Sequence, residues 1–380
     1  MKMFDVYPLQ NVSVVRAEGS WVWDSEGNKY LDMYGGHAVI SIGHTHPEYV
    51  KALTEQLGRI GFYSNSVVIE RQQRLAEKLG RLSGKESNRL FLVNSGAEAN
   101  ENAIKLASFA TGRRKVVAFS ASFHGRTSLA VAATANRSIV APVNETDNVV
   151  FSEFNDGAAL ERLFAEQGGE IACVIIEAIQ GVGGIKVADA GFLRLIRTLC
   201  DRYGAVMIAD EVQCGCGRSG RYYATDWAGV QADIYTMAKG IGNGFPVGAI
   251  SVGSRFEARY GMLGTTFGGS YLACAAMEAV ADVMEREGLV AHAGAMGDYL
   301  TGELKKLSGL SEVRGRGLMI GIELPFEMAE FKRRLLTEEH IFVGAAGKNV
   351  IRLLPALNIT REHADRFLTS FSKLLTSYCR

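Results

Sequence analysis

Two adjacent carboxylates follow an apolar run near the middle of the chain. Asp210 and Glu211 open the stretch "DEVQ" directly after "AVMIA", a run that is typical of a buried strand. A buried carboxylate without a partner costs on the order of several kcal/mol, so a cation or a hydrogen-bond donor must face it. A protonated ring nitrogen of a bound group is one such partner for an acid at the end of a strand.

A lysine ends a second apolar run. Lys239 in "AKG" follows the stretch "DIYTM". A lysine at this place is either a surface side chain with its charge in solvent or a buried amine with a lowered pKa. The second kind of lysine is suited to Schiff-base chemistry.

The motif "NSGAEAN" (residues 94–100) follows the apolar run "FLV" and opens an expected helix. Ser95 and Glu98 fit a capping box, and Gly96 would let a ligand approach the backbone closely. The free amides and the dipole at a helix start favour a phosphate group. The ordinary alternative is a helix cap that binds no ligand.

The motif "SFHGR" (residues 122–126) follows "VVAF" and supplies an aromatic ring and a cation. Phe123 could belong to the hydrophobic core, and Arg126 could be a solvated charge. Each of the four motifs therefore has a structural explanation when it is taken alone.

One cofactor uses all four motifs. Pyridoxal 5′-phosphate needs a lysine imine, an acid at its ring nitrogen, an aromatic side chain against its ring and a cradle for its phosphate. Asp210 is then the acid at the ring nitrogen, and Glu211 is expected to lie behind it. Gln213 in "DEVQ" could donate to the phenolate oxygen of the ring.

The elements that must position these motifs are expected between residues 90 and 255. Short apolar runs alternate there with helical patterns, which predicts an α/β fold with a mainly parallel sheet. The helical spacing of apolar residues from Phe192 to Tyr203, closed by Gly204, predicts a helix between two of the strands. Ligands bind at the carboxyl ends of strands in such sheets, where these motifs fall. The expected strands are "RLFLV", "KVVAF", "NVVF", "ACVIIEAI", "AVMIAD", "DIYTMAK" and "PVGAISVG".

The two ends of the chain have a different pattern. Residues 20–33 predict a hairpin with a turn near Gly27. The last 110 residues or so begin with a long helix and continue through mixed short strands and helices, among them "VRGRGLMIGIEL" and "NVIRLLPALNI". We therefore expect a large domain over residues 50–255 and a smaller α+β domain formed by residues 1–49 and 256–380.

The composition excludes several classes of partner. Among 380 residues, 41 basic and 41 acidic side chains cancel, so no charge surplus indicates a nucleic acid or an anionic membrane. The N-terminus "MKMFDVYPLQ" has no apolar segment of a signal peptide, and no run is long enough to span a membrane. A cytoplasmic protein is expected.

The cysteines and histidines do not predict a metal site. Cys214 and Cys216 form a C-x-C pair without a second pair, and His44 and His46 in "GHTHP" are expected in a turn before a helix. The remaining cysteines show no disulfide pattern; they are Cys173, Cys200, Cys274 and Cys379.

The chain resembles the class-III (ornithine/4-aminobutyrate type) pyridoxal-phosphate aminotransferases. The resemblance extends from "YLDMYGGHAV" and "GHTHP" through the four motifs to "VIRLLPALNI". It implies a fold-type-I architecture and a homodimer with active sites at the subunit interface. It also implies transfer of the terminal amino group of an N-acylated ornithine to 2-oxoglutarate in arginine biosynthesis, with acetylornithine as the first choice of donor and succinylornithine as the second.

The resemblance also implies a role for each matching residue. Phosphate-binding amides would come from Gly96 and Ala97, Phe123 would stack on the ring, Asp210 would hold the ring nitrogen, and Lys239 would form the imine and move the proton. Thr266 would reach the phosphate of the neighbouring subunit's cofactor, with Thr265 beside the substrate. Arg126 would bind the α-carboxylate of the acylornithine, and Arg352 would bind that of glutamate or 2-oxoglutarate.

Three departures from the family pattern bear on this expectation. Ser270 and Tyr271 stand where relatives usually have Asn–Pro, and His37 replaces an apolar residue near the substrate entrance. In "EAIQGVGG", Val182 stands where many relatives have a glutamate that pairs with the arginine matching Arg352. Arg352 should then be less neutralised, unless Glu177 substitutes, and free ornithine with its second ammonium should be a poor donor.

Other functions remain open from the sequence alone. The enzyme could prefer ornithine or 4-aminobutyrate, or it could use the same cofactor for racemisation or epimerisation. A cofactor-sensing regulator is a third class, but such proteins usually carry a DNA-binding module, and this chain has no spare segment or basic face for one.

Overall fold

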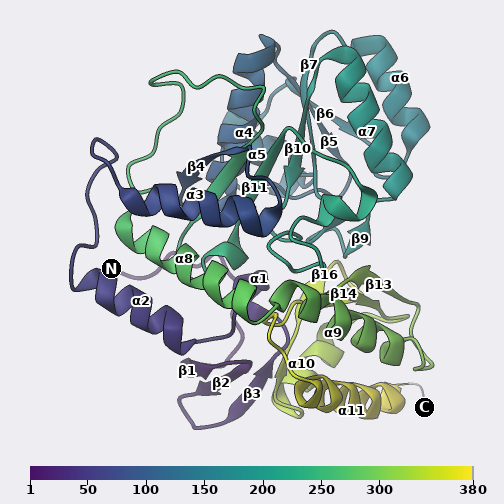
Figure 1. Ribbon diagram of the computed structural model, residues 1–380. Helices are drawn as coiled ribbons and strands as arrows, with labels where there is room; N and C mark the ends of the chain where they lie inside the picture. The colour runs from purple at the N-terminus through teal and green to yellow at the C-terminus, as the bar shows by residue number, and fades with distance from the viewer. Residues whose placement is uncertain (379–380) are drawn as a thin grey trace.

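The computed structural model describes residues 1–378 and is built around a seven-stranded sheet (Figure 1). The strand order across this sheet is β4-β12-β11-β10-β7-β5-β6. Each of the seven apolar runs predicted as strands contributes to it, because continuous apolar runs suit strands that are covered on both faces. The strands are β4 (Arg89–Val93), β5 (Lys115–Phe119), β6 (Val149–Ser152), β7 (Ile171–Ile176), β10 (Val206–Asp210), β11 (Ile234–Ala238) and β12 (Gly248–Val252).

Most neighbours in this sheet are parallel. Strand β10 pairs in parallel with β7 and β11, and β5 pairs in parallel with β6 and β7. Strand β12 is antiparallel to both β11 and β4. The sheet is therefore mixed but mainly parallel, and the predicted α/β class is confirmed.

Helices cover the large sheet. In α7 (Ala190–Tyr203) the side chains of Phe192, Ile196 and Leu199 are buried, and the helix ends at Gly204 in a left-handed conformation, as predicted. Helix α7 packs beside α6 (Gly157–Gln167), and both lie along the sheet in the upper half of Figure 1. Helix α4 (Gly96–Thr111) contacts β7, β10, β11 and β12.

The two chain ends share a small sheet. Strands β2 (Trp21–Asp24) and β3 (Lys29–Asp32) form the predicted hairpin, and β15 (Ile341–Phe342) from the C-terminal part pairs in parallel with β3. The same sheet includes β1 (Val14–Glu18). This pairing supports a unit made from both ends, while the domain boundaries at residues 50 and 255 stay a prediction.

A further four-stranded sheet lies in the C-terminal part of the chain. Its order is β13-β14-β17-β16, with every neighbouring pair antiparallel. The bounds are β13 (Glu312–Arg316), β14 (Met319–Glu323), β16 (Gly344–Ala346) and β17 (Val350–Leu353). The remaining short elements are α1 (Gly35–Ala38), α5 (Ser128–Ala132), β8 (Ile179–Gln180), β9 (Lys186–Val187), η1 (Arg137–Ile139), η2 (Pro142–Asn144), η3 (Ala224–Ala228) and η4 (Lys239–Ile241).

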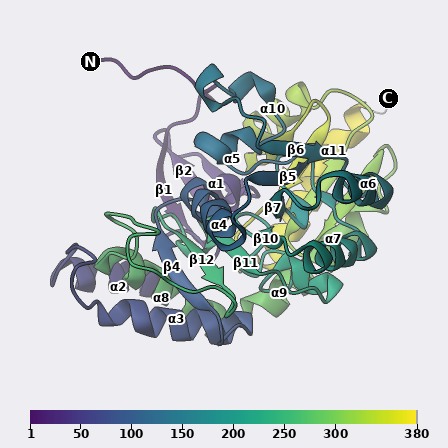
Figure 2. The same cartoon turned by 90° about the horizontal axis from the view of Figure 1, so that it is seen from above.

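Helix α8 (Tyr271–Arg286) packs against two helices from the N-terminal part of the chain. It contacts both α2 (Pro47–Leu57) and α3 (Glu70–Ser83), and Figure 2 shows these three helices at the side of the molecule away from α6 and α7. The hydroxyl of Ser270 accepts from the amide of Ala273, so the serine that departs from the family pattern caps this helix.

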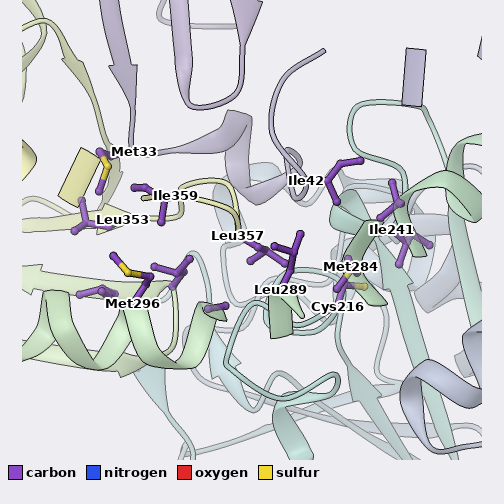
Figure 3. Packing of buried hydrophobic residues seen from close by; sticks show 14 of the residues in the cluster. Met33, Ile42, Cys216, Ile241, Met284, Leu289, Met296, Leu353, Leu357 and Ile359 are labelled. Carbon is purple, nitrogen blue, oxygen red and sulfur yellow. The ribbon is translucent and has the colours of Figure 1, made fainter. Parts of the chain in front are cut away.

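The largest hydrophobic cluster draws on distant parts of the chain. Met33 and Ile42 from the N-terminal part, Met284 from α8, and Leu353 and Ile359 from the C-terminal part belong to this one cluster (Figure 3). The C-terminal helices that frame it are α9 (Leu289–Leu304), α10 (Ala329–Thr337) and α11 (Arg361–Tyr378). Burial of these apolar side chains holds both chain ends against the centre.

The structure also bears on membranes, metals and cysteines. Across residues 1–378, no helix combines the length and the apolar character needed to cross a membrane. The same part of the chain has no group of three or more His, Cys, Asp or Glu side chains arranged to hold a metal ion. Cys379 lies outside the described residues. The other cysteines are free and buried; they are Cys173, Cys200, Cys214, Cys216 and Cys274.

Glu211, one of the two adjacent carboxylates, has its own set of hydrogen-bond donors. Its buried side chain accepts from the amides of Ala224 and Thr225 at 2.8 and 3.0 Å, and from the Thr225 hydroxyl at 2.9 Å. Burial raises the pKa of Glu211 to about 7, and these hydrogen bonds oppose that rise. Glu211 therefore ties the end of β10 to the turn η3.

We predict that Glu211→Ala lowers the free energy of unfolding by roughly 2–5 kcal/mol, because it leaves several buried donors without an acceptor. Glu211→Gln keeps one acceptor oxygen and should cost less. Urea unfolding followed by fluorescence measures both variants, with Glu166→Ala on the exposed face of α6 as the matched control. A Glu211→Ala protein within 1 kcal/mol of the wild type, roughly one hydrogen bond, would contradict the proposed role.

Candidate active site

A cavity of about 880 Å³ opens where the strands of the large sheet end. Its walls come from the segments that follow β4, β5, β7, β10 and β11, together with β17 and the N-terminal segment around residue 37. Most of the residues predicted as a site line this one cavity; they are Gly96, Ala97, Phe123, Arg126, Asp210, Gln213, Lys239 and Arg352. Val182, Glu177 and His37 line it as well.

Two predicted residues lie outside this cavity. The hydroxyl of Thr265 accepts from the Asn94 side-chain amide at 3.2 Å, and Thr266 beside it is exposed. Neither threonine is among the residues that line the cavity within the described part of the chain. Their roles at a cofactor or substrate stay predictions.

Asp210 is the other of the two adjacent carboxylates, and its hydrogen-bond donors come from three places. It is 3% exposed and accepts from His124 Nδ1 at 2.7 Å, from Asn100 Nδ2 at 2.8 Å and from the amide of Val212 at 3.0 Å. The side-chain amide of Asn100 also donates to the His124 carbonyl at 2.7 Å. These donors offset the burial of the charge and fix the direction of the carboxylate.

His124 and Asn100 are functional candidates that the sequence reasoning missed. Both lie inside motifs that the sequence analysis describes, "SFHGR" and "NSGAEAN", so the sequence shows their residue types. The sequence does not show their contact with Asp210, because the two hydrogen bonds join positions 86 and 110 residues apart in the chain.

Lys239 directly follows β11 and has a strained backbone conformation. It has φ of 48°, a left-handed conformation that costs a non-glycine residue free energy. Burial lowers the pKa of Lys239, while the carboxylates of Asp210 and Glu177 oppose that effect. A lysine amine with a lowered pKa is more often neutral and therefore more nucleophilic at neutral pH.

The start of α4 offers unused amides to the cavity. The Ser95 hydroxyl accepts from the Glu98 amide at 3.2 Å, as predicted, but the Glu98 carboxylate accepts from Asn94 at 3.0 and 2.8 Å rather than from Ser95. The predicted capping box is therefore only half right. Within residues 1–378 the amides of Gly96 and Ala97 have no acceptor, which suits an anion at this helix start.

Gly96 is required by packing. A Cβ at this position would lie 2.6 Å from a methyl group of Val212, so a side chain would push the segment after β10 out of place. Val212 therefore lies close to Gly96, and the close approach of a ligand expected at this glycine stays a prediction.

Phe123 and Glu177 are linked across the cavity wall. The Phe123 amide donates to Glu177 Oε1 at 2.9 Å, and the amide of Gly181 donates to Glu177 Oε2 at 3.0 Å. Burial raises the pKa of Glu177 to about 7, with His124 opposing and Asp210 adding to the rise. The exposed Arg126 holds its guanidinium 5.9 Å from the centre of the Phe123 ring.

Arg352 is 4% exposed and points to neutral acceptors. Its Nη1 donates to the Gly181 carbonyl at 3.0 Å and its Nη2 to the Tyr34 hydroxyl at 3.2 Å. No carboxylate forms an ion pair with it in the described structure; Glu177, the substitute considered from the sequence, contacts backbone amides instead. Burial lowers the pKa of Arg352, and the influence of Tyr34 and Glu177 opposes this.

Gln213 connects the cavity to the N-terminal segment. Its Nε2 donates to the His37 carbonyl at 3.1 Å, and its Oε1 is buried without a partner among residues 1–378. A side-chain amide has two hydrogens, so one remains for a ligand in the cavity.

Comparison with known proteins identifies the family to which this chain is similar. Residues 5–375 match the model of the family described as aminotransferase class-III. The acetylornithine aminotransferase of Archaeoglobus fulgidus is 41% identical, with 96% of each chain covered, and that of Nitrosomonas europaea is 38% identical, covering 98% of this chain and 97% of the relative.

Solved structures have the same fold. The acetylornithine aminotransferase of Elizabethkingia anophelis superposes with a TM-score of 0.87 at 31% identity, covering 98% of this chain and 95% of the other. The ornithine aminotransferase of Toxoplasma gondii superposes with a TM-score of 0.91 at 28% identity, covering 98% and 93%. This chain belongs to the class-III aminotransferases.

Proposed function

We propose that this aminotransferase uses pyridoxal 5′-phosphate and moves the terminal amino group of an N-acylated ornithine, with acetyl as the first choice of acyl group, to 2-oxoglutarate. The products are the corresponding semialdehyde and glutamate, which suits a step of arginine biosynthesis. The observation that carries the proposal is one cavity that contains a lysine, a buried carboxylate and two arginines, of which Arg352 has only neutral partners among residues 1–378.

The residues of the cavity fit the cofactor. The amides of Gly96 and Ala97 are free to donate to a phosphate, and the Phe123 ring lines the same cavity. Asp210, kept in place by His124 and Asn100, is suited to hold a proton on a ring nitrogen. When bound, pyridoxal phosphate supplies an electron sink beside the carbon that loses its proton.

Three residues of the cavity would then transfer the proton and bind the substrates. Lys239, whose pKa is lowered by burial, would take the proton and return it. Arg126 would bind the α-carboxylate of the donor, and Arg352 would bind that of glutamate or 2-oxoglutarate by charge-assisted hydrogen bonds. An arginine without a carboxylate partner favours a dicarboxylate and disfavours the second ammonium of free ornithine.

A homodimer is part of the proposal. Thr266 is exposed, lies outside the cavity of its own chain, and would reach the phosphate of the neighbouring subunit's cofactor. The ring of Phe267 beside it is 61% exposed and lies 5.3 Å from that of Phe62, which is 43% exposed. Exposed aromatic side chains of this kind support a subunit contact here.

We expect acetylornithine to give the highest kcat/KM with 2-oxoglutarate in a panel with succinylornithine, ornithine and 4-aminobutyrate. Glutamate should form stoichiometrically with the semialdehyde, which separates transamination from racemisation. Lys239→Ala, the negative control, should abolish turnover and covalent attachment of the cofactor after borohydride reduction. Free ornithine as good as acetylornithine would refute the donor assignment, and succinylornithine as the best donor would change the acyl group.

Arg126→Ala should raise KM for the acylornithine about tenfold or more and change KM for 2-oxoglutarate much less. The reason is that a charge-assisted contact is worth roughly 1.5–3 kcal/mol, and Arg126 would hold only the donor's carboxylate. Steady-state kinetics with each substrate varied in turn measure the difference, with Arg162→Ala on the exposed face of α6 as a control. Equal losses for both substrates would make Arg126 a structural residue.

Val182→Glu should raise KM for 2-oxoglutarate roughly two- to fivefold, because the new carboxylate would compete for Arg352 from a half-exposed position, and an ion pair that solvent reaches contributes up to about 1 kcal/mol. Val182 is 48% exposed and lines the cavity together with Arg352. Val182→Gln, of equal length and without charge, is the matched control. A KM that is unchanged or lower in the glutamate variant would show that position 182 does not face Arg352.

A further inference from the structure

Arg352 is buried without the acidic partner that a buried cation usually requires. Its Nη1 and Nη2 donate to the Gly181 carbonyl and the Tyr34 hydroxyl, and its Nε has no partner in the described part of the chain. A guanidinium held only by neutral groups retains its full charge for a ligand. The support given by Tyr34 therefore matters for how this arginine meets a substrate.

The Tyr34 hydroxyl makes two contacts with opposite roles. A guanidinium can only donate, so the phenol oxygen accepts from Arg352 Nη2, and its own hydrogen is left for His37 Nδ1 with which it forms a short contact. A neutral His37 with its hydrogen on Nε2 fits this arrangement, because its Nδ1 can then accept from the phenol. His37 is exposed on one side; its partial burial and the charges of Arg352, Lys239 and Lys332 lower its pKa, which favours the neutral form.

The ring of Tyr34 is seated by the backbone around it. Asp32 Oδ1 accepts from the amides of Tyr34 and Gly35 at 2.9 and 2.8 Å, which fixes the turn that carries the tyrosine. A Cβ at position 344 would lie 2.2 Å from the ring, so only glycine leaves room for it there. Gly344 pairs with Arg352 across β16 and β17, which puts the ring directly beside the arginine.

His37 is held from the other side of the same site. It has φ of 68°, it lines the cavity, and its carbonyl accepts from Gln213 Nε2 at 3.1 Å. Its ring meets that of Tyr34 edge to face, with 4.9 Å between ring centres. One chain of contacts thus runs from Gln213 through His37 and Tyr34 to Arg352.

We propose that Tyr34 and His37 are positioning residues that keep Arg352 directed into the cavity and available to a carboxylate, and that they thereby set the preference for a 2-oxo dicarboxylate as amino acceptor. This inference rests on the proposed function, in which Arg352 binds the acceptor. A neutral phenol does not have to be displaced when a carboxylate arrives, whereas an acidic partner does. The pair therefore holds the arginine without competing for it.

Tyr34→Phe tests the pair directly, because phenylalanine keeps the ring over Gly344 and removes only the hydroxyl. We expect KM for 2-oxoglutarate to rise roughly three- to tenfold, the effect of losing one hydrogen bond, and KM for acetylornithine to change less than twofold. Calorimetry with glutarate, a dicarboxylate that cannot react, should show the same loss of affinity in the holoenzyme without any turnover.

Two further variants separate positioning from general damage. His37→Asn keeps an acceptor close to the position of Nδ1, and asparagine tolerates a left-handed backbone, so it should retain most of the glutarate affinity that His37→Ala loses. In an Arg352→Lys background, Tyr34→Phe should weaken glutarate binding by less than twofold, because the hydroxyl acts through Arg352.

The outcomes also distinguish this inference from the proposed function. Equal rises of both KM values in Tyr34→Phe, or unchanged glutarate affinity, would overturn the role of the pair while wild-type glutamate formation leaves the proposed function standing. A wild-type enzyme that forms no glutamate from any donor would instead overturn the proposed function. A loss of glutarate affinity in Tyr34→Phe would still support the pair in that case.

Discussion

The cavity depends on the burial of one carboxylate. Asp210 is 3% exposed, and it is kept in place by donors from α4, from the segment after β5 and from its own turn. A charge in such surroundings must be satisfied by several donors, so the ends of these elements cannot move independently. The same donors tie Asp210 to α4 through Asn100 and, through His124, to the segment that contains Phe123.

The acids around the cavity have hydrogen-bond partners of their own, whereas Arg352 has no acidic partner in the described structure. Asp210 has donors on both oxygens and Glu177 is bonded to two backbone amides, so neither acid pairs with Arg352. Arg352 instead donates to the Tyr34 hydroxyl, which is hydrogen-bonded in turn to His37. A site with this balance attracts anionic substrates and keeps an arginine ready for a carboxylate.

Much of the fold could be predicted because its signals are local. The apolar runs that became the large sheet, the helix that ends at Gly204 and the hairpin around Gly27 all follow from spacing within short windows. The same holds for Ser95, which caps α4 as expected, whereas the bond of Glu98 to Asn94 was not predicted. That second bond depends on how the preceding turn packs, which no short window contains.

The sequence by itself determined which chemical groups this protein has at the ends of its strands, Lys239 and Asp210 above all, because residue type and periodicity are written along the chain. Only the tertiary structure decided what these groups touch. His124 and Asn100 reach Asp210, Glu211 turns to η3 while Asp210 lines the cavity, and Tyr34 meets Arg352 from 318 positions away. Such contacts depend on the register and packing of remote elements, and these are settled only when the whole core is formed.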